Sequence, residues 1–121
     1  MDSILESVKK MLGNGEGYDY FDSDIIMCIN SVFSTLYQLG VGPEGGYQIT
    51  GPDEKWTDYT DDTVLLGFIK PYMFTKVKLT FDPPQSSFVL SAYEKQIQET
   101  EWRLNVHVDP ANPKWGGMSN G

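Results

Sequence analysis

Few residues in this chain have the types and the spacing that enzyme chemistry needs. A nucleophile needs a base beside it to become reactive, and the chain holds one cysteine, Cys28, and one histidine, His107. Cys28 is expected to be a small buried residue within a helix, with no obvious histidine partner. His107 falls where the last predicted helix gives way to a tail, and the helix dipole favours a cation there. Both residues are therefore expected to be structural.

Carboxylates crowd one predicted loop, where an oxygen-ligated cation such as Ca²⁺ is conceivable. They are Asp53, Glu54, Asp58, Asp61 and Asp62. Their spacing does not fit the Asp-x-Asp-x-Asp-Gly pattern with a terminal Glu. The glycines of residues 13–17 only loosely resemble a dinucleotide fingerprint, and they follow a predicted helix rather than a strand. We therefore expect no catalytic residue, no metal and no cofactor, and a protein that is not an enzyme. A small hydrolase acting through Asp61, Asp62 or His107 is the weakest alternative.

Composition indicates one globular domain with an acidic surface. The chain has 121 residues, 40% hydrophobic and 13% aromatic, and a formal net charge of −8. An acidic surface repels phosphates, so specific nucleic-acid binding is not expected. The chain starts without a basic and apolar leader, and its longest apolar runs, Ile25–Ile29 and Val64–Ile69, are too short to span a bilayer. We expect a soluble protein made in the cytoplasm, with no membrane partner.

Apolar residues at helical spacing, with capping residues at their ends, predict an all-α domain of four helices over residues 1–107. The predicted helices run from Ser3 to Leu12, from Asp22 or Ser23 to Leu39, from Asp61 or Asp62 to about Phe81, and from Ser87 to about Val106. Pro71 lies inside the third helix, four residues after Gly67, and we expect a kink there rather than a break.

Glycines and prolines punctuate residues 41–61, between the second and third predicted helices. Tyr47–Thr50 alternates and has β propensity, and Lys55–Thr57 is its candidate return strand. The sequence predicts either a short hairpin or a long extended loop. A loop of this length in a small domain usually has a function, although a flap that covers the core, held by Trp56 and Tyr59, is an equal alternative.

The connection between the last two helices is the most informative segment. Pro83 and Pro84 disfavour helix in the residues before them, so the third helix should end near Phe81 or Asp82. Ser86 or Ser87 can then cap the fourth helix. Residues at spacings of three and four draw one stripe along that helix: Leu90, Tyr93, Ile97, Thr100 and Leu104. We expect a helical hairpin with a structural hinge at Asp82, Pro83 and Pro84.

Residues 108–121 form the predicted extended C-terminal tail. Pro110 and Pro113 disfavour a helix, and the glycines beyond them loosen the backbone. Trp115 is the one anchor in this tail, and a tryptophan is typical of a segment that docks on a partner. A tail that frays, or that folds back on its own domain, is the alternative.

Three blocks together resemble the head–tail connector (adaptor) proteins of tailed double-stranded DNA phages. They are MDSILESVKKMLG at residues 1–13, FDSDIIMCINSVFSTLYQLGVGPEGG at residues 21–46 and KLTFDPPQSSFVLSAYEKQIQETEWRLNV at residues 78–106. The resemblance covers residues 1–107, and its order of elements and FDPP hinge are fairly specific. It implies a virion protein at the head–tail interface that forms an oligomeric ring under the portal protein, extends the DNA channel for genome packaging and ejection, and docks a head-closure (stopper) or tail protein.

A ring built by one repeated contact needs two different faces on each subunit. Four residues of the loop between the second and third helices are the candidate subunit interface: Tyr47, Ile49, Trp56 and Tyr59. The outer sides of the last two helices are candidates for the other face, and Pro110, Pro113 and Trp115 for docking on a partner. A negative lumen would let double-stranded DNA pass without sticking, in non-specific proximity only. The competing hypothesis is an acidic interaction protein such as a DNA mimic.

Overall fold

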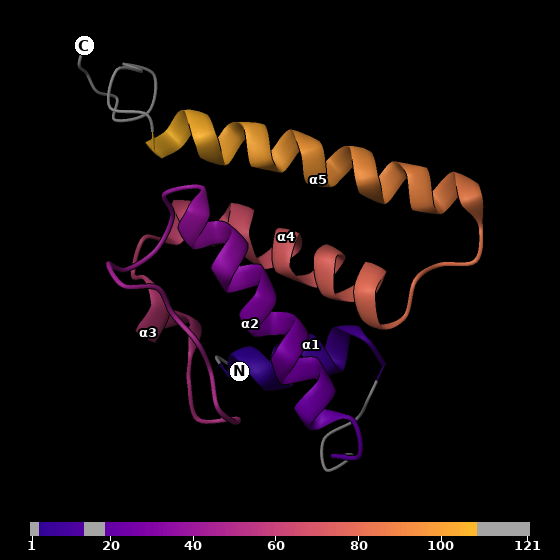
Figure 1. Ribbon diagram of the computed structural model, residues 1–121, viewed down its shortest axis with the longest axis horizontal. Helices are drawn as coiled ribbons and strands as arrows, with labels where there is room; N and C mark the ends of the chain where they lie inside the picture. The colour runs from indigo at the N-terminus through magenta and orange to yellow at the C-terminus, as the bar shows by residue number, and fades with distance from the viewer. Residues whose placement is uncertain (1–2, 14–18, 109–121) are drawn as a thin grey trace.

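The computed structural model describes residues 3–13 and 19–108. They form five helices, and no strand is present among them: α1 (Ile4–Met11), α2 (Asp22–Gln38), α3 (Trp56–Tyr59), α4 (Thr63–Phe81) and α5 (Ser87–Val108). Helix α4 is central, since it packs against α2 on one side and α5 on the other, while α1 contacts α2 and α4. Figure 1 shows α5 running back along α4 at one edge of the molecule. The all-α prediction is confirmed, with one short helix more than predicted.

Two helices begin at side-chain caps that the sequence offered as alternatives. Asp62, rather than its neighbour Asp61, caps α4, because its Oδ1 accepts hydrogen bonds from the backbone N–H groups of Val64 and Leu65, both at 3.1 Å. The Oγ of Ser86 accepts a bond of 3.3 Å from the N–H of Val89 at the start of α5. Each cap satisfies N–H groups that have no partner within the helix.

Helix α2 begins at Asp22, one of the two residues predicted to start it. Asp22 is the first helical residue, not the cap, and Phe21 precedes the helix without a side-chain capping bond. The Asp22 carboxylate instead lies 2.9 Å from the Nζ of Lys9. A buried cation of α1 therefore binds a carboxylate in the first turn of α2.

The end of α2 explains the glycine that closes it. Gly40 has a φ of 88°, a left-handed conformation that glycine adopts without steric cost. Its N–H donates to the carbonyl of Tyr37 at 3.0 Å, and the N–H of Val41 donates to the carbonyl of Leu36 at 2.9 Å. These two bonds form a Schellman motif, which turns the chain sharply into the following loop.

The predicted hairpin between α2 and the next helix is not formed. Tyr47–Thr50 pairs with no strand, and Trp56 and Thr57 belong to helix α3 instead of a return strand. In the described residues the one sheet-like contact is an isolated antiparallel bridge between Ser3 and Lys55. The alternative prediction, a long extended loop, describes residues 41–55 correctly.

Helix α4 runs through Pro71 without ending, as predicted. The helix is apolar on more than one side, because it lies between α2 and α5. Its buried side chains are Leu65, Leu66, Ile69, Tyr72, Met73 and Val77. From α5, by contrast, Leu104 is the one fully buried side chain among those the structure describes. Helix α5 therefore lies on the body of the domain as an outer layer.

Candidate interaction surfaces

The loop between α2 and α3 is held to α2 by one side chain. The Nδ2 of Asn30 donates to the carbonyl of Ile49 at 3.0 Å, and the N–H of Ile49 donates to the Oδ1 of Asn30 at 2.8 Å. The amide thus pairs with both backbone groups of one residue, as a neighbouring strand would. Asn30 thus pairs with the segment for which the sequence predicted Lys55–Thr57 as the partner strand.

The following turn is closed by the carboxylate of Glu54. It accepts bonds of 2.9 Å from both the N–H and the Oγ1 of Thr50, and one of 3.3 Å from the N–H of Gly51. The pKa of the Glu54 carboxyl lies below its usual value. Burial by itself would raise this pKa, but the hydrogen bonds that the carboxylate accepts lower it by more. The carbonyl of Glu54 accepts from the N–H of Ile4, which ties the turn to α1.

The four residues predicted as a subunit interface lie together, and they point into the domain. Ile49, Trp56 and Tyr59 are buried, and Tyr47 is partly buried. The rings of Tyr47 and Tyr59 both pack on Phe33 of α2, with centroids 5.1 and 4.7 Å away. Burial raises the pKa of the Tyr59 hydroxyl well above its usual range. In this structure the four side chains form part of the core, and their role between subunits stays a prediction.

Trp56 connects three elements from its place at the start of α3. Its Nε1 donates to the Oγ of Ser7 on α1 at 3.0 Å. Its ring packs edge-on against Phe74 of α4, and the Nζ of Lys70 lies 5.7 Å from the ring centroid, within the range of a cation–π contact. Substitution of Trp56 would therefore disturb the core as well as the loop.

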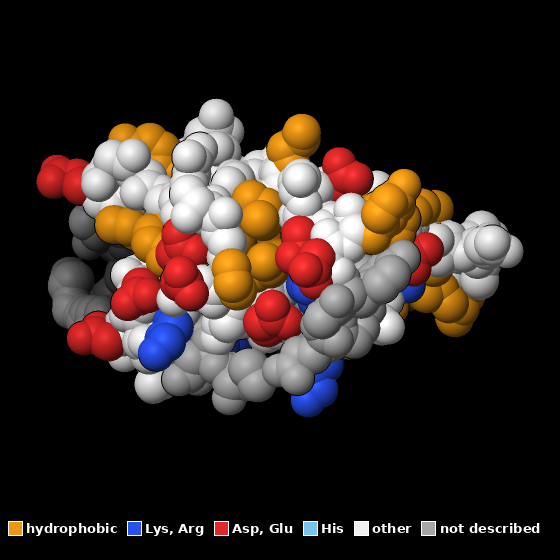
Figure 2. Space-filling view, turned by 90° about the horizontal axis from the view of Figure 1, so that it is seen from below, with side chains coloured by type: hydrophobic (Ala, Val, Ile, Leu, Met, Phe, Trp, Pro, Cys, Tyr) orange, Lys and Arg blue, Asp and Glu red, His pale blue; other side chains and the backbone are white. Residues whose placement is uncertain are grey.

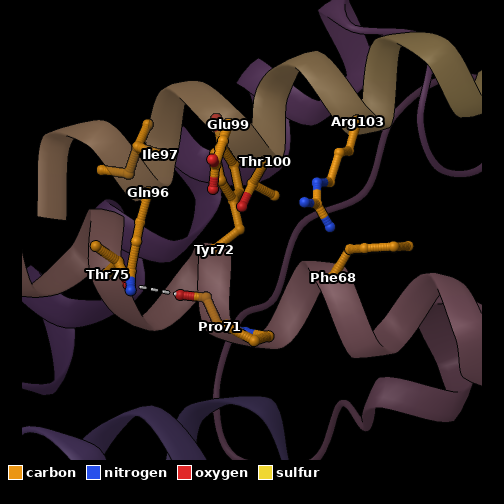
Figure 3. A pocket seen from close by; sticks show the side chains of 9 residues that line it. All are labelled: Phe68, Pro71, Tyr72, Thr75, Gln96, Ile97, Glu99, Thr100 and Arg103. Atoms are coloured by element: carbon orange, nitrogen blue, oxygen red, sulfur yellow. Dashed lines mark hydrogen bonds between the residues drawn. The ribbon is translucent and has the colours of Figure 1, made fainter. Parts of the chain in front are cut away.

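A groove of about 250 Å³ lies between α4 and α5 (Figure 3). It is lined by Phe68, Pro71, Tyr72 and Thr75 of α4 and by Gln96, Ile97, Glu99, Thr100 and Arg103 of α5. Gln96 and Arg103 reach from α5 toward α4. Within residues 3–13 and 19–108, Arg103 forms no ion pair.

Below the groove, one hydrogen bond fastens α5 to α4. The hydroxyl of Tyr72 donates to the Oε2 of Glu101 at 2.7 Å. Burial, together with the Glu101 carboxylate, raises the pKa of Tyr72 well above its usual range, so the hydroxyl keeps its proton and remains a donor. Tyr72 therefore acts as a fixed link between the two helices.

The predicted hinge lies between α4 and α5. Helix α4 ends at Phe81, Asp82 is its C-cap, and Pro83 and Pro84 follow before α5 begins. The Nζ of Lys78 lies 3.2 Å from the Oδ2 of Asp82. The tail residues Pro110, Pro113 and Trp115 lie outside the described residues.

The residues first considered for chemistry have structural surroundings where the structure describes them. Asp58 accepts a bond of 2.9 Å from the N–H of Lys55, and Asp62 caps α4. Burial, with Asp24 nearby, raises the pKa of the Cys28 thiol, which makes the thiolate less available. His107 belongs to the last turn of α5, and its side chain lies outside the description. Among the described residues no three His, Cys, Asp or Glu side chains gather as a metal site requires.

The side of α5 that faces away from α4 belongs to a candidate face predicted from the sequence, but its exposed aromatic residues were not named there. Phe88 and Trp102 stand on it with 82% and 64% of their surface exposed. The predicted stripe from Leu90 to Leu104 packs inward. A second stripe with the same spacing, starting at Phe88, was the signal that could have revealed these aromatic residues.

The opposite side of the molecule is acidic. Figure 2 shows the face away from α5, on which Asp and Glu side chains predominate over Lys and Arg. None of the helices within the described ranges has both the length and the apolar character needed to cross a membrane.

The described helices place the chain in the class of small all-helical proteins. Comparison with protein families then gives a match to the phage connector protein family over residues 4–111. Because the match spans most of the chain, the protein belongs to that family, a structural family of the head–tail region of the virion. Searches of curated proteins and of solved structures gave no match.

Proposed function

We propose that this protein is a structural head–tail connector that forms a ring under the portal protein, extends the DNA channel and docks a head-closure or tail protein. The observation that carries this proposal is the family match over residues 4–111. A structural role, without catalysis, also fits the surroundings of Asp58 and Asp62, whose carboxylates cap helices.

A ring contact requires two different faces, and the structure offers two candidates. One is the loop of residues 41–62 with α3, and the other is the outer sides of α4 and α5 (Figure 1). Glu44, Gln48 and Asp53 are exposed on the loop. We assign the contact to such exposed residues, while Tyr47, Ile49, Trp56 and Tyr59 hold the loop in the shape that a neighbour would meet.

Charge gives the ring a further property. Each copy carries a formal net charge of −8, so a ring multiplies the negative charge around its channel. A negative lumen repels the phosphates of double-stranded DNA, and the genome would slide without binding. The acidic face in Figure 2 supplies a surface of the required sign.

Electron microscopy of virions tests the proposed function. We expect a ring of density between portal and tail into which residues 3–13 and 19–108 fit as rigid helices. Clear neck density that excludes this chain would contradict the proposal. If, in addition, the protein captured a DNA-binding enzyme without associating with capsids, it would instead be an acidic interaction protein such as a DNA mimic.

A further inference from the structure

The exposed side of α5 carries a second helical stripe, which we name the outer seam. It consists of Phe88, Ala92, Lys95, Glu99, Trp102 and Val106, of which Glu99 also lines the groove between α4 and α5. Phe88, Ala92, Lys95, Glu99 and Trp102 are exposed, and Val106 is half-buried. Their spacings are four, three, four, three and four, which keeps them in line on one side of a helix. Leu90 and Leu104 lie on the other side of α5, toward α4.

The outer seam is complementary to a reversed copy of itself, both in the size of its side chains and in their charge. If two copies of α5 lie antiparallel with their centres aligned, Phe88 meets Val106 of the other copy. In the same register Ala92 meets Trp102, and Lys95 meets Glu99. The small side chain of Ala92 leaves room for the indole of Trp102. At each end of the helix pair, the ring of Phe88 contacts the aliphatic side chain of Val106. Two ion pairs, one on each side of the centre, complete the register.

Other arrangements of the same seam are less favourable. A parallel pair in register would place Lys95 against Lys95 and Glu99 against Glu99, and like charges face to face weaken an interface. Within residues 3–13 and 19–108, neither Lys95 nor Glu99 forms an ion pair. The antiparallel register instead places each Lys95 against a Glu99 of the other copy, so their order along α5 selects the antiparallel direction.

We propose that the free protein forms a two-fold homodimer in which the outer seams of two α5 helices pack antiparallel. Such a contact is isologous, so it closes on itself after two copies and cannot extend into a ring. The dimer goes beyond the proposed connector role and does not depend on it. In a connector it would cover the exposed aromatics of α5 until the partners of the neck are present.

The dimer is a weak one, because a single helix pair buries little surface. The seam spans about 27 Å at the rise of an α-helix, and one pair of helices of this length falls below the ~1,200 Å² of a standard interface. We expect dissociation in the micromolar range. Trp102 should contribute most, since a buried tryptophan is the commonest interface anchor.

Analytical sedimentation of the full chain at about 1 to about 500 μM covers the expected range of dissociation constants. Variants in which the charges of Lys95 and Glu99 are exchanged test the proposed register. We expect a monomer–dimer equilibrium in the wild type. Lys95→Glu and Glu99→Lys should each shift it toward monomer at least tenfold, since each creates two like-charge pairs. The double variant Lys95→Glu/Glu99→Lys restores both ion pairs in an isologous antiparallel contact, so it should return to the wild-type equilibrium. A double variant as weak as the single ones would overturn the proposal.

Apolar substitutions provide an independent test with a matched control. Trp102→Ala should weaken the dimer at least as much as Lys95→Glu. Met27→Ala on α2, where the methionine is 67% exposed, should leave it unchanged. Circular dichroism checks that each variant keeps its helices, as expected for exposed positions. A wild type that stays monomeric at every concentration, or a dimer that Trp102→Ala leaves intact, would also overturn the proposal.

Discussion

Lys9 shows at the scale of one residue how the domain uses a buried charge. The residue is 1% exposed, and its Nζ lies 2.9 Å from Asp22 and 4.0 Å from both Glu6 and Asp19. Burial alone would lower the pKa of Lys9, but the hydrogen bond to Asp22 and the charges of the three carboxylates outweigh it and raise the pKa. The cation therefore fixes α1 to the beginning of α2.

The raised pKa predicts how stability depends on pH. Since folded Lys9 holds its proton more tightly than the unfolded chain does, its contribution is complete below the unfolded pKa of 10.5 and is lost as pH rises through the folded pKa. We expect the difference in unfolding free energy between wild type and Lys9→Met to be constant from about pH 6 to 9 and to narrow above 10.5. Denaturant titrations at several pH values measure it. Lys10→Met, an exposed neighbour, is the control and should show no such narrowing. A difference that does not change with pH would show that Lys9 is not stabilised as a cation.

At the scale of the elements, helices were predictable from sequence and the loop was not. The periodicity and caps of α1, α4 and α5 are local, so a single sequence contains them. The conformation of the loop depends on Asn30, which binds Ile49 from nineteen positions away, and on Trp56, whose indole reaches Ser7. Local β propensity at Lys55–Thr57 was overridden by these tertiary contacts. The outer seam of α5 was visible as spacing, but its exposure required the fold.

The hinge carries a prediction about elements, because two prolines set how α5 leaves α4. Replacing both Pro83 and Pro84 with alanine removes a restriction on the unfolded chain and costs about 0.4–1 kcal/mol for each residue. The larger effect should be on assembly, since the connection would accept many angles between the helices. We expect the melting temperature to fall by several degrees, while the domain stays folded and incorporation into particles falls much further, as measured by quantitative blotting of virions. Pro52→Ala, in the exposed turn of the loop, is the control for a proline outside the hinge. Normal incorporation of the double variant would show that the packing of α5 on α4 sets the angle without the prolines.

For the whole molecule, the distribution of charge favours a structural role over DNA mimicry. A mimic displays carboxylates in regular rows, whereas here several are used within the fold. Asp62 caps α4, and Asp58 accepts a hydrogen bond from the backbone N–H of Lys55. Glu54 accepts three hydrogen bonds from groups of the turn that it closes. Three of the 17 acidic side chains thus have roles within the fold. The remaining acidic surface suits a protein that lies beside DNA without binding it.

The C-terminal tail provides the prediction that separates folding from docking. Residues 108–121 include Pro110, Pro113 and Trp115, and the family match ends at residue 111. Termination after Val108 keeps all five helices, so we expect unchanged circular dichroism and melting temperature. Binding to purified portal or head-closure protein should weaken by at least tenfold, because a docked tryptophan typically contributes about 2 kcal/mol or more. Full-length Trp115→Ala should reproduce most of this loss, and Met118→Ala, beyond the anchor, should not. If the shortened chain binds normally, docking depends on the helical body, and the groove with Arg103 becomes the surface to test.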